Sequence, residues 1–124
     1  MKMYYLYILL LEGNNKYIGI TENLDARIEK HFNGEGSEWC KLHKPIDILY
    51  TKKLNCNLID AKLYEKIHTL CNMYTDGINK VRGAAYTRRQ EYRESMFDKY
   101  FVHLNRNMCR NEIISILTGI IFNE

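Results

Sequence analysis

Residues 3–31, MYYLYILLLEGNNKYIGITENLDARIEKH, decide the fold of this chain. They contain two apolar runs separated by residues 12–15, whose sequence Glu-Gly-Asn-Asn is typical of a chain reversal. This pattern predicts a β-hairpin with a four-residue turn. Tyr7 lies in the first run and Tyr17 in the second. Because strand side chains alternate between two faces, both tyrosines can point to the same face of the sheet.

A short helix is predicted over residues 24–32, directly after the hairpin. Thr21 or Asn23 can cap its first turn, and an Asn-Gly pair follows its last residue. Arg27 and His31 are four residues apart, so they lie along one border of the apolar stripe of this helix. We therefore expect both side chains to point toward the face of the sheet that carries the two tyrosines.

The expected fold is α+β (α/β in the broad sense), a small three-stranded antiparallel sheet flanked by helices. A second short helix is predicted over residues 37–42, a third strand over 46–51 and a long helix from 57 or 58 to 74. Residues 78–86 define no clear element. Residues 1–86 form the expected core, and residues 87–124 a helical C-terminal extension that packs on it without being an independent domain.

The long helix has an apolar stripe at helical spacing, which predicts the side that it buries. Its members are Ile59, Leu63, Ile67, Leu70 and Tyr74. Glu65 lies well away from that stripe, so periodicity alone predicts a solvent-facing carboxylate.

Composition indicates one globular domain. The chain has 124 residues, of which 46% are hydrophobic and 27% charged, and this excludes a disordered protein. Its four cysteines form no CxxC pair, and no signal segment opens the sequence, so reduced thiols and an intracellular location are expected. The apolar run at residues 113–122 is too short to span a bilayer. It predicts a buried helix or a homodimer contact rather than a membrane partner.

Basic residues are concentrated in the C-terminal third. Residues 78–110 contain eight lysines and arginines and three acidic residues, whereas the whole chain carries a formal net charge of +3. Such a region can follow the phosphates of a nucleic acid. The candidate nucleic-acid-binding residues are Lys41, His43, Lys44, Arg82, Arg88 and Arg89.

Several motifs resemble those of the GIY-YIG nuclease superfamily. Residues 5–7, Tyr-Leu-Tyr, are similar to its first motif, with tyrosine in place of the glycine, and residues 17–19, Tyr-Ile-Gly, match the second letter for letter. Arg27 and His31 stand where the family has an arginine and often a histidine one turn later. Glu65 stands where the family has a metal-binding glutamate. The resemblance covers residues 3–86, and its end is similar to nuclease-like proteins of large DNA viruses.

The resemblance implies a divalent-metal-dependent endonuclease that hydrolyses DNA, with RNA left open as a substrate. Glu65 would hold Mg²⁺ or Mn²⁺, and Arg27 would pair with the scissile phosphate. Tyr7 would activate or orient the attacking water, Tyr17 would hold phosphate or water, and His31 would carry a proton or donate a hydrogen bond. These roles are exchangeable at this point.

Two other interpretations of the same residues remain open. Tyrosines in strands are most simply packing residues, and an arginine and a histidine at the rim of a helix are most often solvated. A non-catalytic nucleic-acid-binding module that keeps the nuclease fold is the alternative function. It predicts salt-sensitive binding without cleavage.

Overall fold

The computed structural model describes residues 2–84, 86 and 87. The predicted C-terminal extension, with Arg88, Arg89 and the helix expected to form a homodimer contact, therefore lies outside the described residues. The described elements, in chain order, are β1 (Tyr4–Leu11), the 3-10 turn η1 (Glu12–Asn14), β2 (Asn15–Thr21), α1 (Leu24–Phe32), α2 (Glu38–Leu42), β3 (Pro45–Leu54), α3 (Leu58–Asp76) and β4 (Val81–Gly83).

The sheet has four strands in the order β3-β1-β2-β4. The predicted hairpin is present, with β1 antiparallel to β2, and β3 pairs antiparallel with the other edge of β1. Its turn has three residues and not the predicted four, because Asn15 already pairs with Leu11 in the sheet. The prediction of three antiparallel strands is wrong in one respect, since β4 adds a fourth strand that runs parallel to β2. The α+β class holds, with a mixed sheet in place of an antiparallel one.

The fourth strand escaped prediction because it is only three residues long, too short to show an alternating pattern. All three of its residues are buried. Gly83 allows the close approach to β2, because a Cβ at this position would collide with the Ile18 carbonyl oxygen and the Thr69 hydroxyl. β4 pairs only with residues 16–18, so none of the described strands covers the outer edge of β2 beyond that point.

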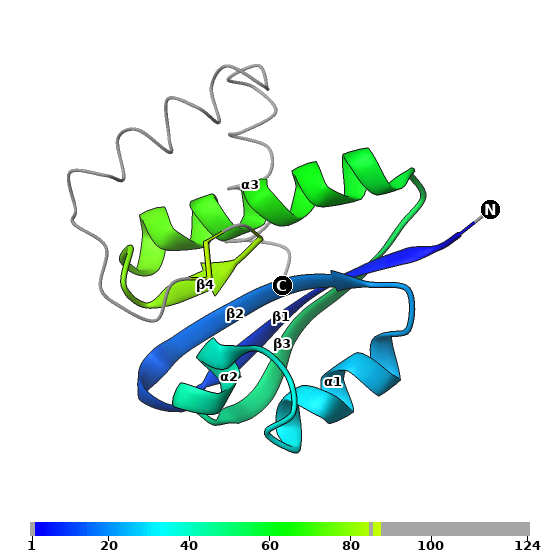
Figure 1. Ribbon diagram of the computed structural model, residues 1–124. Coiled ribbons are helices and arrows are strands. Elements are labelled where there is room, and N and C mark those ends of the chain that lie inside the picture. Colours follow the sequence, from blue (N-terminus) through cyan, green and yellow to red (C-terminus); the bar gives the residue numbers. More distant parts are fainter. Residues whose placement is uncertain (1, 85, 88–124) are drawn as a thin grey trace.

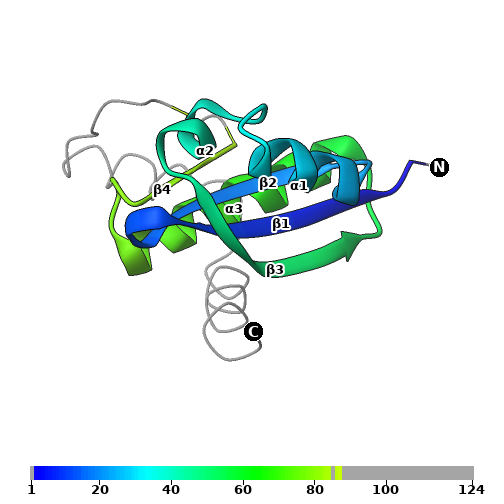
Figure 2. The same ribbon diagram turned by 90° about the horizontal axis from the view of Figure 1, so that it is seen from below.

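Helices cover both faces of the sheet. Figure 1 shows α3 on one side and α1 with α2 on the other, and Figure 2 shows the two short helices over the same face. The alternation of β1 separates two cores: Leu6 and Ile8 belong to the core beneath α3, whereas Tyr7 and Leu9 belong to the core beneath α1 and α2. Functional side chains from the hairpin and α1 therefore share one face.

The buried side of α3 differs from its predicted apolar stripe. Ile59 is 79% exposed and Tyr74 61% exposed, whereas Ala61, His68 and Asn72 are buried. The polar members of this side have internal partners. Asn72, for example, accepts a hydrogen bond from Lys16 Nζ (3.3 Å) and donates one to the His68 carbonyl (2.8 Å). A pattern of hydrophobicity alone cannot register such partners, and it therefore placed Glu65 on the wrong side of the helix.

His68 is expected to make folding sensitive to acid. It stacks on Tyr50, with ring centroids 6.1 Å apart, and among the described residues its Nδ1 has no hydrogen-bond partner. Burial, with a smaller effect of Lys52, lowers its pKa to about 4. The unfolded chain, with a histidine pKa near 6.5, thus binds more protons as the pH falls from 6.5 to 4, and the free energy of unfolding decreases over that range.

Urea unfolding across this pH range measures the effect. At about 1.4 kcal/mol per pKa unit, His68 accounts for a loss of about 3 kcal/mol between pH 6.5 and 4. His31, whose pKa burial also lowers to about 4, adds a loss of similar size. The carboxyl group of Glu65, whose pKa burial raises to about 7, acts in the opposite direction over this range, so the variant His68→Leu should reduce the acid-induced loss of stability by about 3 kcal/mol relative to the wild type. An unchanged pH dependence in this variant would contradict the assignment.

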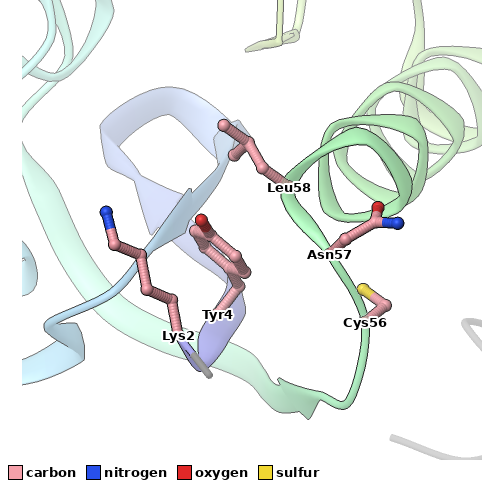
Figure 3. A pocket seen from close by; sticks show the side chains of 5 residues that line it. All are labelled: Lys2, Tyr4, Cys56, Asn57 and Leu58. Atoms are coloured by element: carbon pink, nitrogen blue, oxygen red, sulfur yellow. The ribbon is translucent and has the colours of Figure 1, made fainter.

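A pocket of about 460 Å³ lies where the first strand and α3 begin (Figure 3). It contains none of the candidate site residues, and its lining consists of Lys2, Tyr4, Cys56, Asn57 and Leu58. The ammonium group of Lys2 forms an exposed ion pair with Glu22 at 3.5 Å. In the part of the chain that the structure describes, none of the helices combines the length and the apolar character required to cross a membrane.

Candidate active site

Two strand tyrosines and a helix histidine form a compact aromatic cluster beneath α1. The ring centroids of Tyr7 and Tyr17 are 6.3 Å apart, and His31 lies 5.6 Å from the first and 5.1 Å from the second. All three side chains are buried. The structure thus brings together residues from β1, β2 and α1, on the shared face that the hairpin pattern predicts.

Gly19 provides the space that the Tyr7 side chain occupies. The two residues face each other in the β1–β2 pairing. A Cβ at Gly19 would overlap the phenol ring and hydroxyl of Tyr7, so no larger residue fits here without moving the ring. The glycine of the second motif is therefore required to make room for the tyrosine of the first motif.

His31 is held from both sides. Its Nε2 lies 2.8 Å from the Tyr7 hydroxyl oxygen, and its Nδ1 accepts a hydrogen bond of 3.3 Å from the backbone N–H of Ser37. Gly36 lies directly against the imidazole, since a Cβ there would collide with the ring. These contacts explain why His31 is completely buried. The next residue of α1, Phe32, is 37% exposed although it is apolar.

Arg27 lies on the outer side of the cluster and is exposed. Its helix begins at the N-cap Asn23, whose side chain accepts a hydrogen bond from the Ala26 N–H (3.3 Å). Favourable interaction with the Tyr7 phenol, and to a smaller extent with Tyr17, raises the pKa of Arg27 despite partial burial. A cation therefore stands at the mouth of the site with donors available to a ligand.

Glu65 reaches the site around the edge of the sheet. Its Oε2 accepts a hydrogen bond of 3.1 Å from the backbone N–H of Ile20, in the part of β2 that β4 does not cover. Burial raises the pKa of Glu65 to about 7, although the Ile20 amide, Lys62 and Arg27 act in the opposite direction. The carboxylate also raises the pKa of Tyr17, which places it within electrostatic range of the cluster.

Both tyrosines and the histidine are uncharged at neutral pH. Burial raises the pKa of Tyr7 above its usual range, and this outweighs the opposing effect of Arg27. Burial, followed by the charge of Glu65, raises the pKa of Tyr17 to about 12. Burial and the positive charge of Arg27 lower the pKa of His31 to about 4. The site therefore presents neutral phenols beside one exposed cation and one carboxyl group.

The one acidic residue of the site, Glu65, fits a hard divalent cation that keeps most of its water. In the described part of the chain, no group of three or more histidine, cysteine, aspartate or glutamate side chains is arranged to hold a metal. Glu65 uses Oε2 for Ile20, and its Oε1 accepts no hydrogen bond from the described residues. A single carboxylate suits Mg²⁺ or Mn²⁺, whose remaining ligands are water and substrate phosphate. It does not suit a structural zinc site.

The loop that carries Lys41, His43 and Lys44, three of the predicted nucleic-acid-binding residues, offers less positive charge than its sequence suggests. Lys41 is exposed and pairs with Glu38 at 3.3 Å, and Lys44 is exposed. His43 is half-buried and accepts a hydrogen bond from Asn15 through Nδ1 (3.2 Å). Burial, with Lys80 and Arg82, lowers the pKa of His43, so this side chain is neutral at pH 7. Two lysines remain as the exposed cations of this loop.

Arg82 was predicted to bind phosphate, and its position contradicts that role. The side chain is completely buried. Its guanidinium lies over the Trp39 ring at 4.5 Å and donates to the carbonyl oxygens of Ile78 and Val81, both at 2.7 Å. The positive charge is thus stabilised inside the protein by an aromatic face and main-chain oxygens, and the guanidinium has no accessible surface to offer a nucleic acid.

Arg82 is instead expected to stabilise the fold. The variant Arg82→Ala leaves two carbonyl groups without their donor and a cavity beside Trp39, so the free energy of unfolding should decrease by about 3 kcal/mol or more. Urea unfolding measures this change. Lys44→Ala is the matched control, because it removes an exposed cation of the same predicted set and should change stability by less than about 0.5 kcal/mol. Equal effects of the two variants would contradict this role.

Sequence reasoning missed Ser37 as a residue of the site. It lies at the start of the short helix predicted over residues 37–42, and its Oγ accepts a hydrogen bond from the Cys40 N–H (3.2 Å). In addition, its backbone N–H donates a hydrogen bond to His31, and its side chain acts to lower the pKa of Tyr17. The signal that could have found it is the small-residue segment Gly34-Glu35-Gly36-Ser37, which allows a loop to pack against an aromatic cluster.

The family profile described as the GIY-YIG catalytic domain matches residues 3–66, so the chain belongs to the GIY-YIG family. Similar curated proteins include UPF0213 proteins of Staphylococcus saprophyticus (32% identity over 50 residues), Oceanobacillus iheyensis (35% over 52) and Staphylococcus haemolyticus (36% over 50). Each match covers 40–42% of this chain and 60–61% of the relative, so the chain spans about three fifths of their length. No solved structure matches the chain.

Proposed function

We propose that this protein is a divalent-metal-dependent endonuclease that hydrolyses DNA phosphodiester bonds inside the cell. The observation that carries the proposal is the convergence of five side chains at the edge of the sheet next to β2. These side chains are Tyr7, Tyr17, Arg27, His31 and Glu65. Family membership supports a nuclease, and the arrangement supplies a cation, hydroxyl groups and a carboxylate within one site.

Arg27 is suited to hold the scissile phosphate. Its guanidinium is exposed at the mouth of the site, and its forked donors match two phosphate oxygens. The contact gains strength as negative charge develops on the phosphate in the transition state. The two tyrosines belong to the cluster next to it and would contact the same phosphate or the attacking water, and His31 fixes the position of Tyr7.

Glu65 is the residue that would hold Mg²⁺ or Mn²⁺. When bound, such an ion supplies charge stabilisation at the phosphate and the leaving oxygen. A raised carboxyl pKa of about 7 means that Glu65 is partly protonated at neutral pH in the absence of a cation. Metal binding is therefore expected to release a proton and to strengthen as the pH rises through this value.

A cleavage panel tests the proposal. The full chain is incubated with duplex, branched and single-stranded DNA and with RNA, each with Mg²⁺, Mn²⁺ or EDTA. We expect metal-dependent cleavage of at least one DNA substrate and none with EDTA. Salt-sensitive binding without cleavage of any substrate would instead support the non-catalytic nucleic-acid-binding module. The burial of Arg82 and the lowered pKa of His43 favour the enzyme, because they remove two cations from the surface of such a module.

A further inference from the structure

The hydrogen bonds around His31 determine where its proton lies. Nδ1 accepts the Ser37 N–H at 3.3 Å, so this nitrogen carries no proton. A neutral imidazole has one protonated nitrogen, which is then Nε2. The hydrogen bond of 2.8 Å between His31 and Tyr7 therefore runs from Nε2–H to the phenol oxygen. Both ring nitrogens are engaged, and His31 has no free lone pair with which to accept a proton.

The direction of this bond leaves Tyr7 as a donor. A phenol oxygen has two lone pairs and one proton to donate. One lone pair accepts the His31 Nε2–H, and the imidazole cannot take the phenol proton because Nε2 already carries one. The proton of Tyr7 is therefore donated to a group other than His31.

The segment that contains Ser37 is held against His31. Gly36 allows this approach, because a Cβ there would collide with the imidazole. The Ser37 Oγ accepts the Cys40 N–H at 3.2 Å, so the side chain caps α2, while the backbone N–H of Ser37 donates to His31. Ser37 thus acts on Tyr7 through His31 by its main chain.

We infer that Ser37 is a positioning residue whose backbone N–H fixes the direction of the hydrogen bond between His31 and Tyr7, so that Tyr7 donates its hydroxyl proton to an oxygen atom of the bound phosphate. The phosphate as acceptor rests on the proposed nuclease function, whereas the direction of the bonds does not. Tyr7 then stabilises negative charge on the phosphate and does not remove the proton of the attacking water. His31 orients Tyr7 and carries no proton during the reaction.

Nitrogen NMR of the full chain tests the direction of the bonds without any substrate. The ¹⁵N shifts of an imidazole distinguish its two neutral forms, and the variant His31→Gln identifies the signals of this residue. We expect the Nε2–H form of His31 at pH 7. The Nδ1–H form or the charged imidazolium at this pH would overturn the inference. This measurement is independent of whether the protein cleaves DNA.

Two substitutions of Ser37 separate its backbone from its side chain. Ser37 has φ −66° and ψ 156°, a conformation that proline adopts, so Ser37→Pro removes the N–H at little backbone cost. Ser37→Ala removes the hydroxyl and keeps the N–H. The Nε2–H form should persist in the alanine variant and give way to a mixture of forms in the proline variant. If the proline variant retained the pure Nε2–H form while folded, the role of the Ser37 N–H would be disproved.

Incorporation of a fluorinated tyrosine at position 7 tests its role in the reaction. Fluorination lowers the phenol pKa, and a donor becomes inactive once it ionises. Cleavage should therefore fall about 10-fold or more as the pH rises through the lowered pKa, relative to the unmodified protein. An increase in rate over the same range would show that Tyr7 is a base. Absence of cleavage by the unmodified protein would refute the proposed function and leave the NMR result standing.

Discussion

Replacement of Arg27 by alanine is expected to slow DNA cleavage by about 10³-fold or more. Arginines that stabilise the charge of a phosphoryl-transfer transition state contribute about 10³–10⁵-fold to the rate. Arg27 is exposed at the mouth of the site, and its positive charge acts on the Tyr7 phenol. The substitution therefore removes the proposed phosphate contact and the positive charge beside Tyr7. Single-turnover cleavage at saturating protein measures the loss in the chemical step.

Lys30→Ala is the matched control for Arg27→Ala. Lys30 is an exposed cation on the same helix, and the change removes the same charge. It should alter binding slightly through long-range electrostatics and leave the single-turnover rate within about 2-fold. Both variants should unfold at nearly the wild-type urea concentration. A comparable loss of rate in both would mean that only overall charge matters and that Arg27 has no specific role.

Replacement of Glu65 by glutamine should reduce metal-dependent cleavage by about 10³-fold. A metal ion at a phosphate contributes several kcal/mol to transition-state stabilisation, and about 1.4 kcal/mol corresponds to a tenfold change in rate. The glutamine carbonyl oxygen can still accept the Ile20 N–H, so the edge of β2 remains satisfied. The change thus isolates the charge of the carboxylate from its structural hydrogen bond. Cleavage rates measured over a range of Mg²⁺ concentrations give the effect.

Glu29→Gln is the control for this experiment, because Glu29 is an exposed carboxylate on α1. It should leave both the rate and the Mg²⁺ dependence unchanged. A third variant, Glu65→Ala, leaves the Ile20 amide without its acceptor and should destabilise the fold by about 1–3 kcal/mol in addition. If Glu65→Gln cleaved DNA at the wild-type rate, Glu65 would not be a metal ligand, and its role would be limited to accepting the Ile20 N–H at the edge of β2.

The hairpin and α1 could be predicted from the sequence because their signals are local. A polar turn between apolar runs defines β1 and β2, and a capping residue with an Asn-Gly stop defines α1, which spans Leu24–Phe32 as predicted. Strand alternation also placed Tyr7 and Tyr17 on one face, where their rings now lie 6.3 Å apart. These inferences need no knowledge of distant contacts.

Glu65 could not be placed from periodicity, because its partner lies 45 residues earlier in the chain. A hydrophobic stripe predicts burial from side-chain polarity alone. On α3 the buried side includes polar groups whose partners come from β2, such as Lys16 for Asn72 and the Ile20 amide for Glu65. The Ile20 amide is available to Glu65 because β4 is short and pairs only with residues 16–18 of β2. The sequence did not predict β4.

The fate of Arg82 and the roles of the tyrosines depend on tertiary contacts of the same kind. A basic residue in a basic region is most simply assigned to the surface, yet the Trp39 ring and two main-chain oxygens hold Arg82 inside. The sequence likewise allowed Tyr7 to act as base or donor. That choice depends on which group already hydrogen-bonds to its oxygen and where the proton of that group lies, and this information exists only in the folded arrangement with His31 and Ser37.

Cleavage of a labelled DNA duplex by the purified full chain is the most direct test of the proposed function. The reaction is followed with Mg²⁺ or Mn²⁺, with EDTA, and with Glu65→Gln in place of the wild-type chain. We predict strand scission by the wild type that requires the divalent cation and is lost in the variant. Wild-type binding of the duplex without scission under any metal condition, or scission that persists in EDTA and in Glu65→Gln, would contradict a metal-dependent nuclease centred on this site.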